Sequence, residues 1–112
     1  MEVWQTASNL SMNIFALTQA LPRSEDYGLT SQIRRSANSI AANIAEGFGR
    51  KTSKDKANFY IMSRGSLYET QNHLIYGVKI GYFEKTKVDD IINNYNNLAF
   101  DLNKIIKSIS QP

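Results

Sequence analysis

The sequence contains no cysteine, two prolines and six glycines among its 112 residues. The lack of cysteine excludes disulfide bonds, thiolate metal ligands and cysteine nucleophiles, and with them a small secreted protein held together by disulfides. The scarcity of proline and glycine argues against a turn-rich β-sandwich. No apolar run reaches the roughly 18–20 residues that a membrane-spanning helix needs, and the chain does not open like a signal peptide. We therefore expect a cytoplasmic protein that has no membrane partner.

The chain does contain an ordinary globular share of apolar residues, 42%, which argues against global disorder. Two halves of such a short chain would each be too small to fold alone. We therefore expect a single domain over residues 1–112.

Apolar residues recur every three or four positions, the spacing of one face of an α-helix. The first and second stripes are Val3, Ala7, Leu10, Ile14, Leu17 and Leu21, then Leu29, Ile33, Ala37, Ile40, Ile44 and Phe48. The third and fourth are Ala57, Tyr60, Ile61, Leu67, Tyr68, Leu74, Ile75 and Val78, then Val88, Ile91, Tyr95, Leu98, Leu102, Ile105 and Ile109.

Helix boundaries follow from residues that stop or cap helices. Pro22 and several glycines mark ends, and two capping pairs mark starts: Thr52 with Asp55, and Thr86 with Asp89. These signals predict helices over about residues 2–20, 29–47, 53–80 and 87–109. Four helices with short connections indicate an all-α fold, an antiparallel up-and-down four-helix bundle.

Residues for catalysis are scarce. The single histidine, His73, follows Glu69 by four positions, whereas the di-iron motif requires a spacing of three and several more glutamates. We interpret His73 as a surface or boundary residue. No second histidine is available for a hydrolytic triad. We therefore expect no enzyme activity, no metal and no cofactor.

The segment Gly47-Phe-Gly49-Arg-Lys resembles a glycine-rich phosphate loop, but it follows a predicted helix rather than a strand. A helix end with a bend into the next helix is the simpler interpretation. A phosphate-binding loop that uses Arg50 and Lys51 is the alternative. Gly65 interrupts the third helix and admits two interpretations, close approach of a neighbouring subunit or tolerance on an exposed face.

The net charge of +3 is unevenly distributed along the chain. Residues 34–64 carry seven basic side chains against two acidic ones, hence +5, and the remainder carries six against eight, hence −2. The seven are Arg34, Arg35, Arg50, Lys51, Lys54, Lys56 and Arg64. They predict either a nucleic-acid-binding surface or a solvated hairpin with ion pairs. Phe59, Tyr60 and Tyr68 could stack on bases, although core packing is the commoner role.

Residues 27–50, YGLTSQIRRSANSIAANIAEGFGR, resemble the signature of four-helix bundle proteins encoded within intervening sequences of bacterial 23S ribosomal RNA genes. Phe59, the segment 63–69 (SRGSLYE) and Gly81-Tyr82 continue the resemblance in the expected order. The similarity covers nearly the whole chain, and it is weaker in the first and last helices.

The resemblance implies a ring-shaped homo-oligomer, in related proteins a pentamer, without enzyme activity. A relative of this family, the accessory variability protein of diversity-generating retroelements, binds nucleic acid and associates with a reverse transcriptase. We interpret a set of matching residues as structural or interface positions: Tyr27, Gly28, Gln32, Asn43, Glu46, Gly47, Gly65, Ser66 and Glu69.

Two functional hypotheses follow. The first is a homo-oligomer that binds RNA or DNA through a basic surface of the second and third helices. The second is a scaffold ring that docks a partner protein, such as a reverse transcriptase, without contacting nucleic acid itself.

Overall fold

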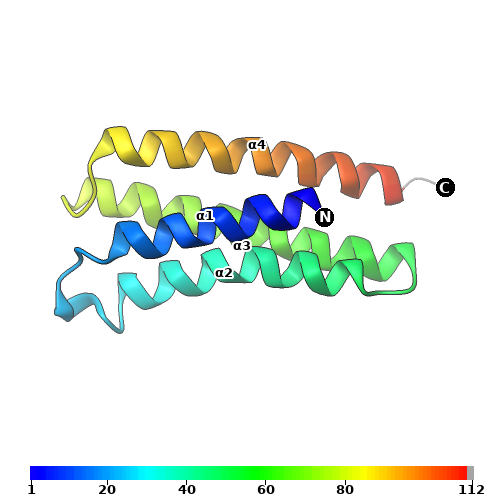
Figure 1. Ribbon diagram of the computed structural model, residues 1–112, viewed down its shortest axis with the longest axis horizontal. Helices are drawn as coiled ribbons and strands as arrows, with labels where there is room; N and C mark the ends of the chain where they lie inside the picture. Colours follow the sequence, from blue (N-terminus) through cyan, green and yellow to red (C-terminus); the bar gives the residue numbers. More distant parts are fainter. Residues whose placement is uncertain (111–112) are drawn as a thin grey trace.

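The computed structural model describes residues 1–110, which form four α-helices, one short 3-10 helix and no strand. Their bounds are α1 (Glu2–Thr18), η1 (Arg23–Glu25), α2 (Leu29–Phe48), α3 (Ser53–Lys79) and α4 (Lys85–Ser110). The helices lie side by side and alternate in direction along a body 48 Å long (Figure 1). The predicted all-α class is confirmed. No helix within the described range is both long and apolar enough to cross a bilayer.

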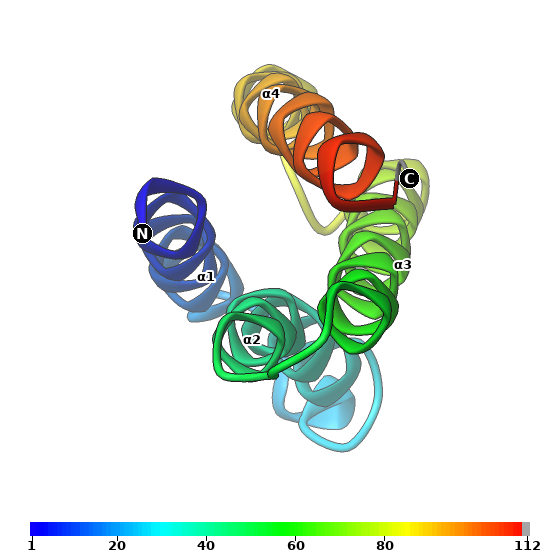
Figure 2. The same cartoon turned by 90° about the vertical axis from the view of Figure 1, so that its right-hand side faces the viewer.

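The four helices do not contact one another equally. Contacts are most extensive between α2 and α3, intermediate for α3 with α4 and α1 with α2, and fewest between α1 and α4. Viewed along the bundle, the chain runs from α1 through α2 and α3 to α4, and among helices that are neighbours around the bundle the first and last are the most widely separated (Figure 2). The α2–α3 pair is therefore the centre of the fold.

The core confirms most of the predicted stripes. Buried residues of α1, α2 and α4 include Val3, Ala7, Leu10, Ile14, Leu29, Ile33, Ala37, Ile40, Ile44, Val88, Tyr95, Leu98 and Leu102. The last member of the second predicted stripe, Phe48, is not in the core, because it is 64% exposed at the end of α2.

The predicted stripe of α3 is partly wrong. Ile61, Tyr68 and Ile75 lie on the surface, 42%, 49% and 47% exposed. The buried face of α3 is Ala57, Tyr60, Ser63, Leu67, Thr70, Leu74 and Gly77. The sequence contains two neighbouring stripes on this helix, and small polar residues complete the buried one, so apolar periodicity alone merges the two.

Two helix boundaries differ from expectation. The first helix ends at Thr18 rather than near residue 20, and the Thr18 hydroxyl donates to the carbonyls of Ile14 and Phe15. The fourth begins at Lys85, so Thr86 lies within its first turn and is not the cap. Gly81, at φ +87°, and amides 82 and 83, which donate to the Gly77 carbonyl, make the preceding turn compact. By contrast, Thr52 caps α3 as predicted, accepting from the Asp55 amide at 3.1 Å.

A side-chain hydrogen bond ties the two connections at one end of the bundle. The Tyr82 hydroxyl donates to Glu25 at 2.9 Å, and the same carboxylate accepts from the Leu29 amide at 3.0 Å. Both bonds hold the pKa of Glu25 below its usual 4.5, and the bond from the Leu29 amide has the larger effect. The bond to Glu25 in turn raises the pKa of Tyr82.

We expect Tyr82→Phe to raise the pKa of Glu25 toward 4.5. A carboxylate whose pKa is lowered by folding adds stability above its unfolded pKa and loses it as the pH falls through the folded pKa. The variant should therefore lose less stability than the parent on acidification. NMR titration of Glu25 and unfolding at neutral and acid pH measure both effects. Tyr76→Phe, the control, should leave the pKa of Glu25 unchanged.

Tyr95 lies in the core of α4 with a hydroxyl that has no hydrogen-bond partner. Burial raises the pKa of this phenol. An unpartnered buried hydroxyl opposes folding by about 1–3 kcal/mol.

We expect Tyr95→Phe to leave the free energy of unfolding unchanged or to raise it by about 1 kcal/mol. Ser36→Ala is the matched control, because the Ser36 hydroxyl is equally buried but pairs with Thr70 at 2.8 Å. That variant should lose about 1 kcal/mol. Urea unfolding measures both, and equal losses in the two variants would contradict the assignment.

Candidate nucleic-acid interface

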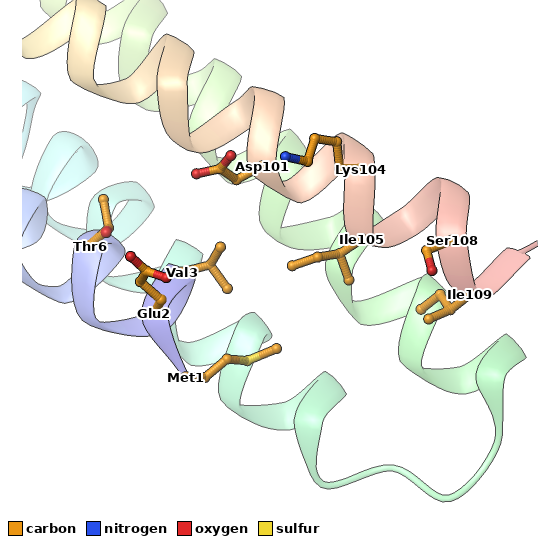
Figure 3. Close-up of a pocket in the computed structure, with 9 residues that line it drawn as sticks. All are labelled: Met1, Glu2, Val3, Thr6, Asp101, Lys104, Ile105, Ser108 and Ile109. Carbon is orange, nitrogen blue, oxygen red and sulfur yellow. The ribbon is translucent and has the colours of Figure 1, made fainter.

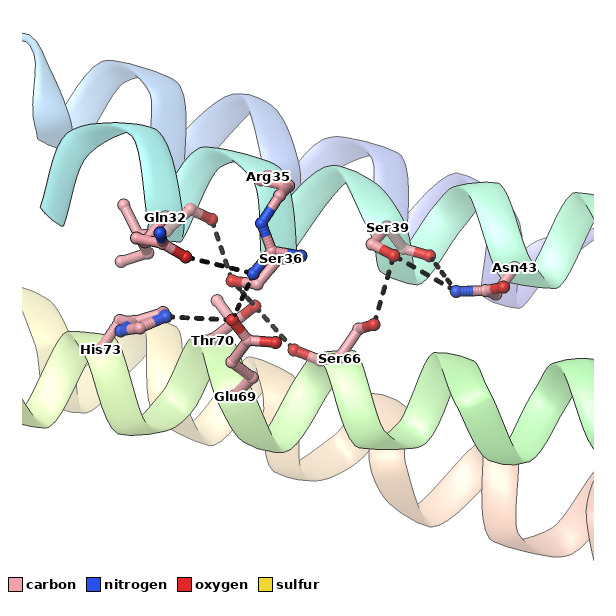
Figure 4. A network of polar contacts seen from close by, with 10 residues as sticks. Gln32, Arg35, Ser36, Ser39, Asn43, Ser66, Glu69, Thr70 and His73 are labelled. Carbon is pink, nitrogen blue, oxygen red and sulfur yellow. Dashed lines mark hydrogen bonds and ion pairs between the residues drawn. The ribbon is translucent and has the colours of Figure 1, made fainter. Parts of the chain in front are cut away.

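Small hydroxyl side chains form the contact between α2 and α3 (Figure 4). The Ser63 hydroxyl donates to the Ile40 carbonyl at 2.8 Å. Ser66 donates to Ser39 at 3.3 Å, and Asn43 donates to the Ser39 carbonyl at 3.0 Å. Short side chains let the two helix axes approach closely, and hydrogen bonds satisfy their buried hydroxyls. This contact fixes the connection between the two helices at the end of the bundle.

An ionic group closes the outer edge of the same contact. Arg35 of α2 pairs with Glu69 of α3, and it also donates to Gln32 at 3.2 Å. Glu69 lies 3.2 Å from His73 as well. Both members of the Arg35–Glu69 pair are partly exposed, so the pair contributes little stability and mainly sets register. Gln32, Ser66 and Glu69 thus lie at the contact between α2 and α3, and their structural or interface role stays a prediction.

The connection itself depends on Gly47. A side chain there would place its Cβ 2.7 Å from the Tyr60 ring and 3.2 Å from the Lys56 carbonyl oxygen. The Lys56 ammonium donates to the Phe48 carbonyl at 2.8 Å, at the C-terminus of α2. The chain therefore bends directly from the end of α2 to Thr52, the cap of α3. Gly47 and Gly49 mark a helix end with a bend into the next helix, as the sequence predicted.

This bend gathers four of the seven candidate cations at one end of the bundle: Arg50, Lys51, Lys54 and Lys56. Arg50 pairs with Glu46 at 3.0 Å, and its guanidinium stacks 4.5 Å from the centre of the Phe59 ring. Lys51 and Lys54 are exposed and have no hydrogen bond or ion pair within the described residues. A hollow lined by Lys54 and Ile109 shows that the end of α4 adjoins this cluster.

The other three candidates lie elsewhere. Arg34 donates to the Thr18 hydroxyl at 2.8 Å and stacks 4.1 Å from the centre of the Phe15 ring, on the α1 side. Arg64 donates to Asn103 at 2.8 Å, on the α4 side. With Arg35 held by Glu69, the seven cations do not form one surface. The basic cluster is the group at residues 50–56.

The aromatic candidates also separate. Tyr60 is buried, which raises the pKa of its phenol and leaves no face for a base. Phe59 lies under Arg50. Tyr68 is exposed on the outer face of α3. Tyr27, at 98% exposure the most exposed large apolar or aromatic side chain of residues 1–110, stands beside Gly28 in the connection before α2.

A hollow of about 600 Å³ lies between the start of α1 and the end of α4 (Figure 3). Its polar groups include Glu2, Asp101 and Lys104, and Ile105 and Ile109 supply apolar lining. Residues 1–110 contain no group of three histidine, cysteine or acidic side chains able to hold a metal ion. The basic cluster, rather than this hollow, offers the chain's clearest recognition chemistry.

The sequence reasoning missed the exposed aromatic residues of the outer helix faces, Trp4, Phe48 and Phe100, as surface features. The second apolar stripe on α3 was a signal for the exposed residues Ile61, Tyr68 and Ile75 of that helix.

The arrangement defines an all-α helical bundle with a basic connection at one end. The sequence profile of the 23S rRNA-intervening sequence protein family matches residues 1–104. The chain therefore belongs to this family, which confirms the resemblance carried by residues 27–50.

A solved structure is similar over nearly the whole fold. It is a protein of unknown function from the S23 ribosomal protein family of Bacteroides thetaiotaomicron, with a TM-score of 0.86 and 24% identity. The match covers 94% of this chain and 98% of that one. At this identity the likeness establishes the fold. Among curated proteins, none matches this sequence significantly.

We expect Gly47→Ala to lower the free energy of unfolding by about 1–3 kcal/mol, because the added methyl overpacks against Tyr60. Gly49→Ala is the matched control, since its Cβ would meet nothing closer than 3.7 Å. That variant should be neutral or gain up to about 1 kcal/mol. Thermal and urea unfolding measure both. Equal stability of the two variants would contradict the close contact at Gly47.

Proposed function

We propose that this chain is a non-enzymatic, homo-oligomeric helical bundle that binds RNA or DNA through the basic connection between α2 and α3. One observation carries the proposal. Residues 50–56 hold four cations against a single acid, Asp55, and Lys51 and Lys54 are exposed, with no hydrogen bond or ion pair to any residue of 1–110. Unpaired lysines on a rigid helix junction contact phosphates without first breaking an ion pair.

Phosphate contact of this kind is independent of base sequence. Each neutralised phosphate releases condensed counterions, so affinity falls as salt rises. Arg50 can add contact while it remains stacked on Phe59. The buried position of Tyr60 means that stacking on bases is not part of this proposal.

One copy carries a small local charge, and assembly multiplies it. Several copies of the cluster in one oligomer bind one strand at several points, which raises avidity without new contacts. Support for assembly comes from the surface, where fourteen large apolar or aromatic side chains of residues 1–110 are at least 36% exposed. Exposed apolar side chains that gather into a patch mark interaction sites, and these fourteen are the candidates for contacts between copies. We propose a ring, with five copies as the family resemblance implies, in the cytoplasm.

We expect the double variant Lys51→Ala/Lys54→Ala to bind generic single-stranded RNA more weakly. If each lysine contacts one phosphate, the slope of log K against log salt falls in magnitude by about 1.4. Fluorescence anisotropy across a salt series measures the slope, and light scattering checks that the oligomer is unchanged.

The matched control is Lys79→Ala/Lys87→Ala, which removes the same charge near the opposite end, from exposed residues without hydrogen bonds or ion pairs. Equal loss in the two double variants would reduce the effect to net charge and contradict the site. No RNA or DNA binding by the parent protein at about 150 mM salt would instead favour the scaffold hypothesis. The exposed aromatic faces would then dock a partner protein, for which a reverse transcriptase is the family-based candidate.

A further inference from the structure

We infer that Arg50 and the hollow beside it accept one unpaired nucleobase, which makes single-stranded nucleic acid the preferred ligand of the basic connection. The inference rests on the proposed function and adds a base contact to the phosphate contacts of Lys51 and Lys54. Phosphate contacts alone are available on single strands and duplexes alike. A base contact favours the single strand, because a paired base has its faces and its pairing edge occupied.

Two contacts hold the guanidinium of Arg50 in place. Its Nη2 atom donates to Glu46 Oε2 at 3.0 Å, and its central carbon lies 4.5 Å from the centre of the Phe59 ring. The Phe59 ring covers one face of this planar cation. The Arg50 side chain is nevertheless 45% exposed. A guanidinium that is already ordered and still exposed is a surface on which nucleobases stack.

An open hollow adjoins Arg50 on the side away from α3. Its volume is about 390 Å³, and it is lined by Ala42, Ala45, Glu46, Gly49 and Arg50. The first four of these residues belong to α2 or to its C-cap, whereas Phe59 belongs to α3 and does not line the hollow. Arg50 therefore separates the Phe59 ring from the hollow. A ring placed in the hollow meets Arg50 from the opposite side.

The hollow has the size and the floor that a planar ring needs. An apolar cavity of about 150 Å³ is enough to hold benzene, so a hollow of about 390 Å³ admits a pyrimidine or a purine. Ala42, Ala45 and Gly49 follow one another by three and four positions, so they share one face of the helix end. A base can lie against this floor without displacing a long side chain.

The charges in the hollow favour a base over a phosphate. Glu46 offsets the charge of Arg50, and its carboxylate repels a phosphate at close range. Every unpaired nucleobase instead carries N–H donors on its pairing edge, which a carboxylate oxygen can accept. Among the hydrogen bonds of residues 1–110, Glu46 uses only its Oε2 atom. Its Oε1 atom is therefore available to the edge of a base.

The cations for the backbone lie within one nucleotide of this hollow. Lys51 directly follows Arg50, and Lys54 lies in the first turn of α3. Consecutive Cα atoms are only about 3.8 Å apart, so a strand with a phosphate at Lys51 brings an adjoining base to Arg50. The basic connection therefore offers a place for one base beside the cations that hold the backbone.

The test compares a mixed-sequence single-stranded DNA with an abasic strand of the same length, which has the same phosphates but no bases. We expect the parent protein to bind the intact strand about tenfold more tightly, or more, as one base stack provides. Arg50→Lys keeps the charge but lacks the planar guanidinium. It should lose about tenfold in affinity for the intact strand and leave binding of the abasic strand and of a matching duplex unchanged. Fluorescence anisotropy at one salt concentration measures all three.

A second variant and a matched control support this comparison. Phe59→Leu keeps an apolar side chain but removes the ring against Arg50, so it should weaken binding of the intact strand alone. Arg23→Lys makes the same exchange as Arg50→Lys at an exposed residue of the connection at the opposite end of the bundle (Figure 1). It should bind all three ligands as the parent does. Circular dichroism checks that each variant keeps the parental helix content.

Each other outcome overturns a defined part. Equal affinity of the parent for the intact and abasic strands would overturn the base contact and leave the phosphate contacts standing. A loss in Arg50→Lys that is equal for both strands would limit Arg50 to phosphate contact and also overturn the inference. A preference for the intact strand that survives in Arg50→Lys would overturn the assignment to this hollow. Failure of the parent to bind either strand at about 150 mM salt would overturn the proposed function itself.

Discussion

The close contact between α2 and α3 is the interaction on which the rest of the structure depends. Serine and threonine side chains line it, with Ser36 paired to Thr70 and Ser63 to the Ile40 carbonyl. Short side chains allow close approach, and each hydrogen bond removes the penalty of a buried hydroxyl. Small residues alternate with Tyr60, Leu67 and Leu74 on the buried face of α3, and a second apolar stripe of the helix lies on its outer side.

The same contact positions the candidate interface. Gly47 lies against Tyr60 where α2 turns into α3, and the turn sets four cations on a rigid junction. The outer faces that the contact leaves unpartnered are apolar and lie to either side of the bundle. In the proposed oligomer, each copy contributes one basic junction, so several phosphate contacts act together.

Much of the fold was predictable from the sequence. Helical periodicity identified the four helices, and Thr52 correctly marked the start of α3. The start of α4 was not predictable in this way. The turn at Gly81 is compact, and the helix begins at Lys85, one residue before the expected cap Thr86. For the candidate site, the sequence showed the excess of basic residues along 34–64. It did not show that these residues lie on separate sides of the bundle. Arg34 contacts α1, and Arg64 contacts α4. The two arginines lie on different helices, so their positions in the sequence do not determine whether they face the same side of the bundle.

The sequence by itself determined the class of the protein, the number of helices and the excess of basic residues in its middle third. These properties are local or additive, so spacing and composition are enough to read them. Only the tertiary structure decided which stripe of α3 is buried, which lysines are unpaired and which aromatic residues face solvent. Those properties depend on what each helix meets across the bundle. For α3 the deciding partner is α2, because hydroxyl side chains of the two helices pair at their contact and Ile61, Tyr68 and Ile75 are left outside it.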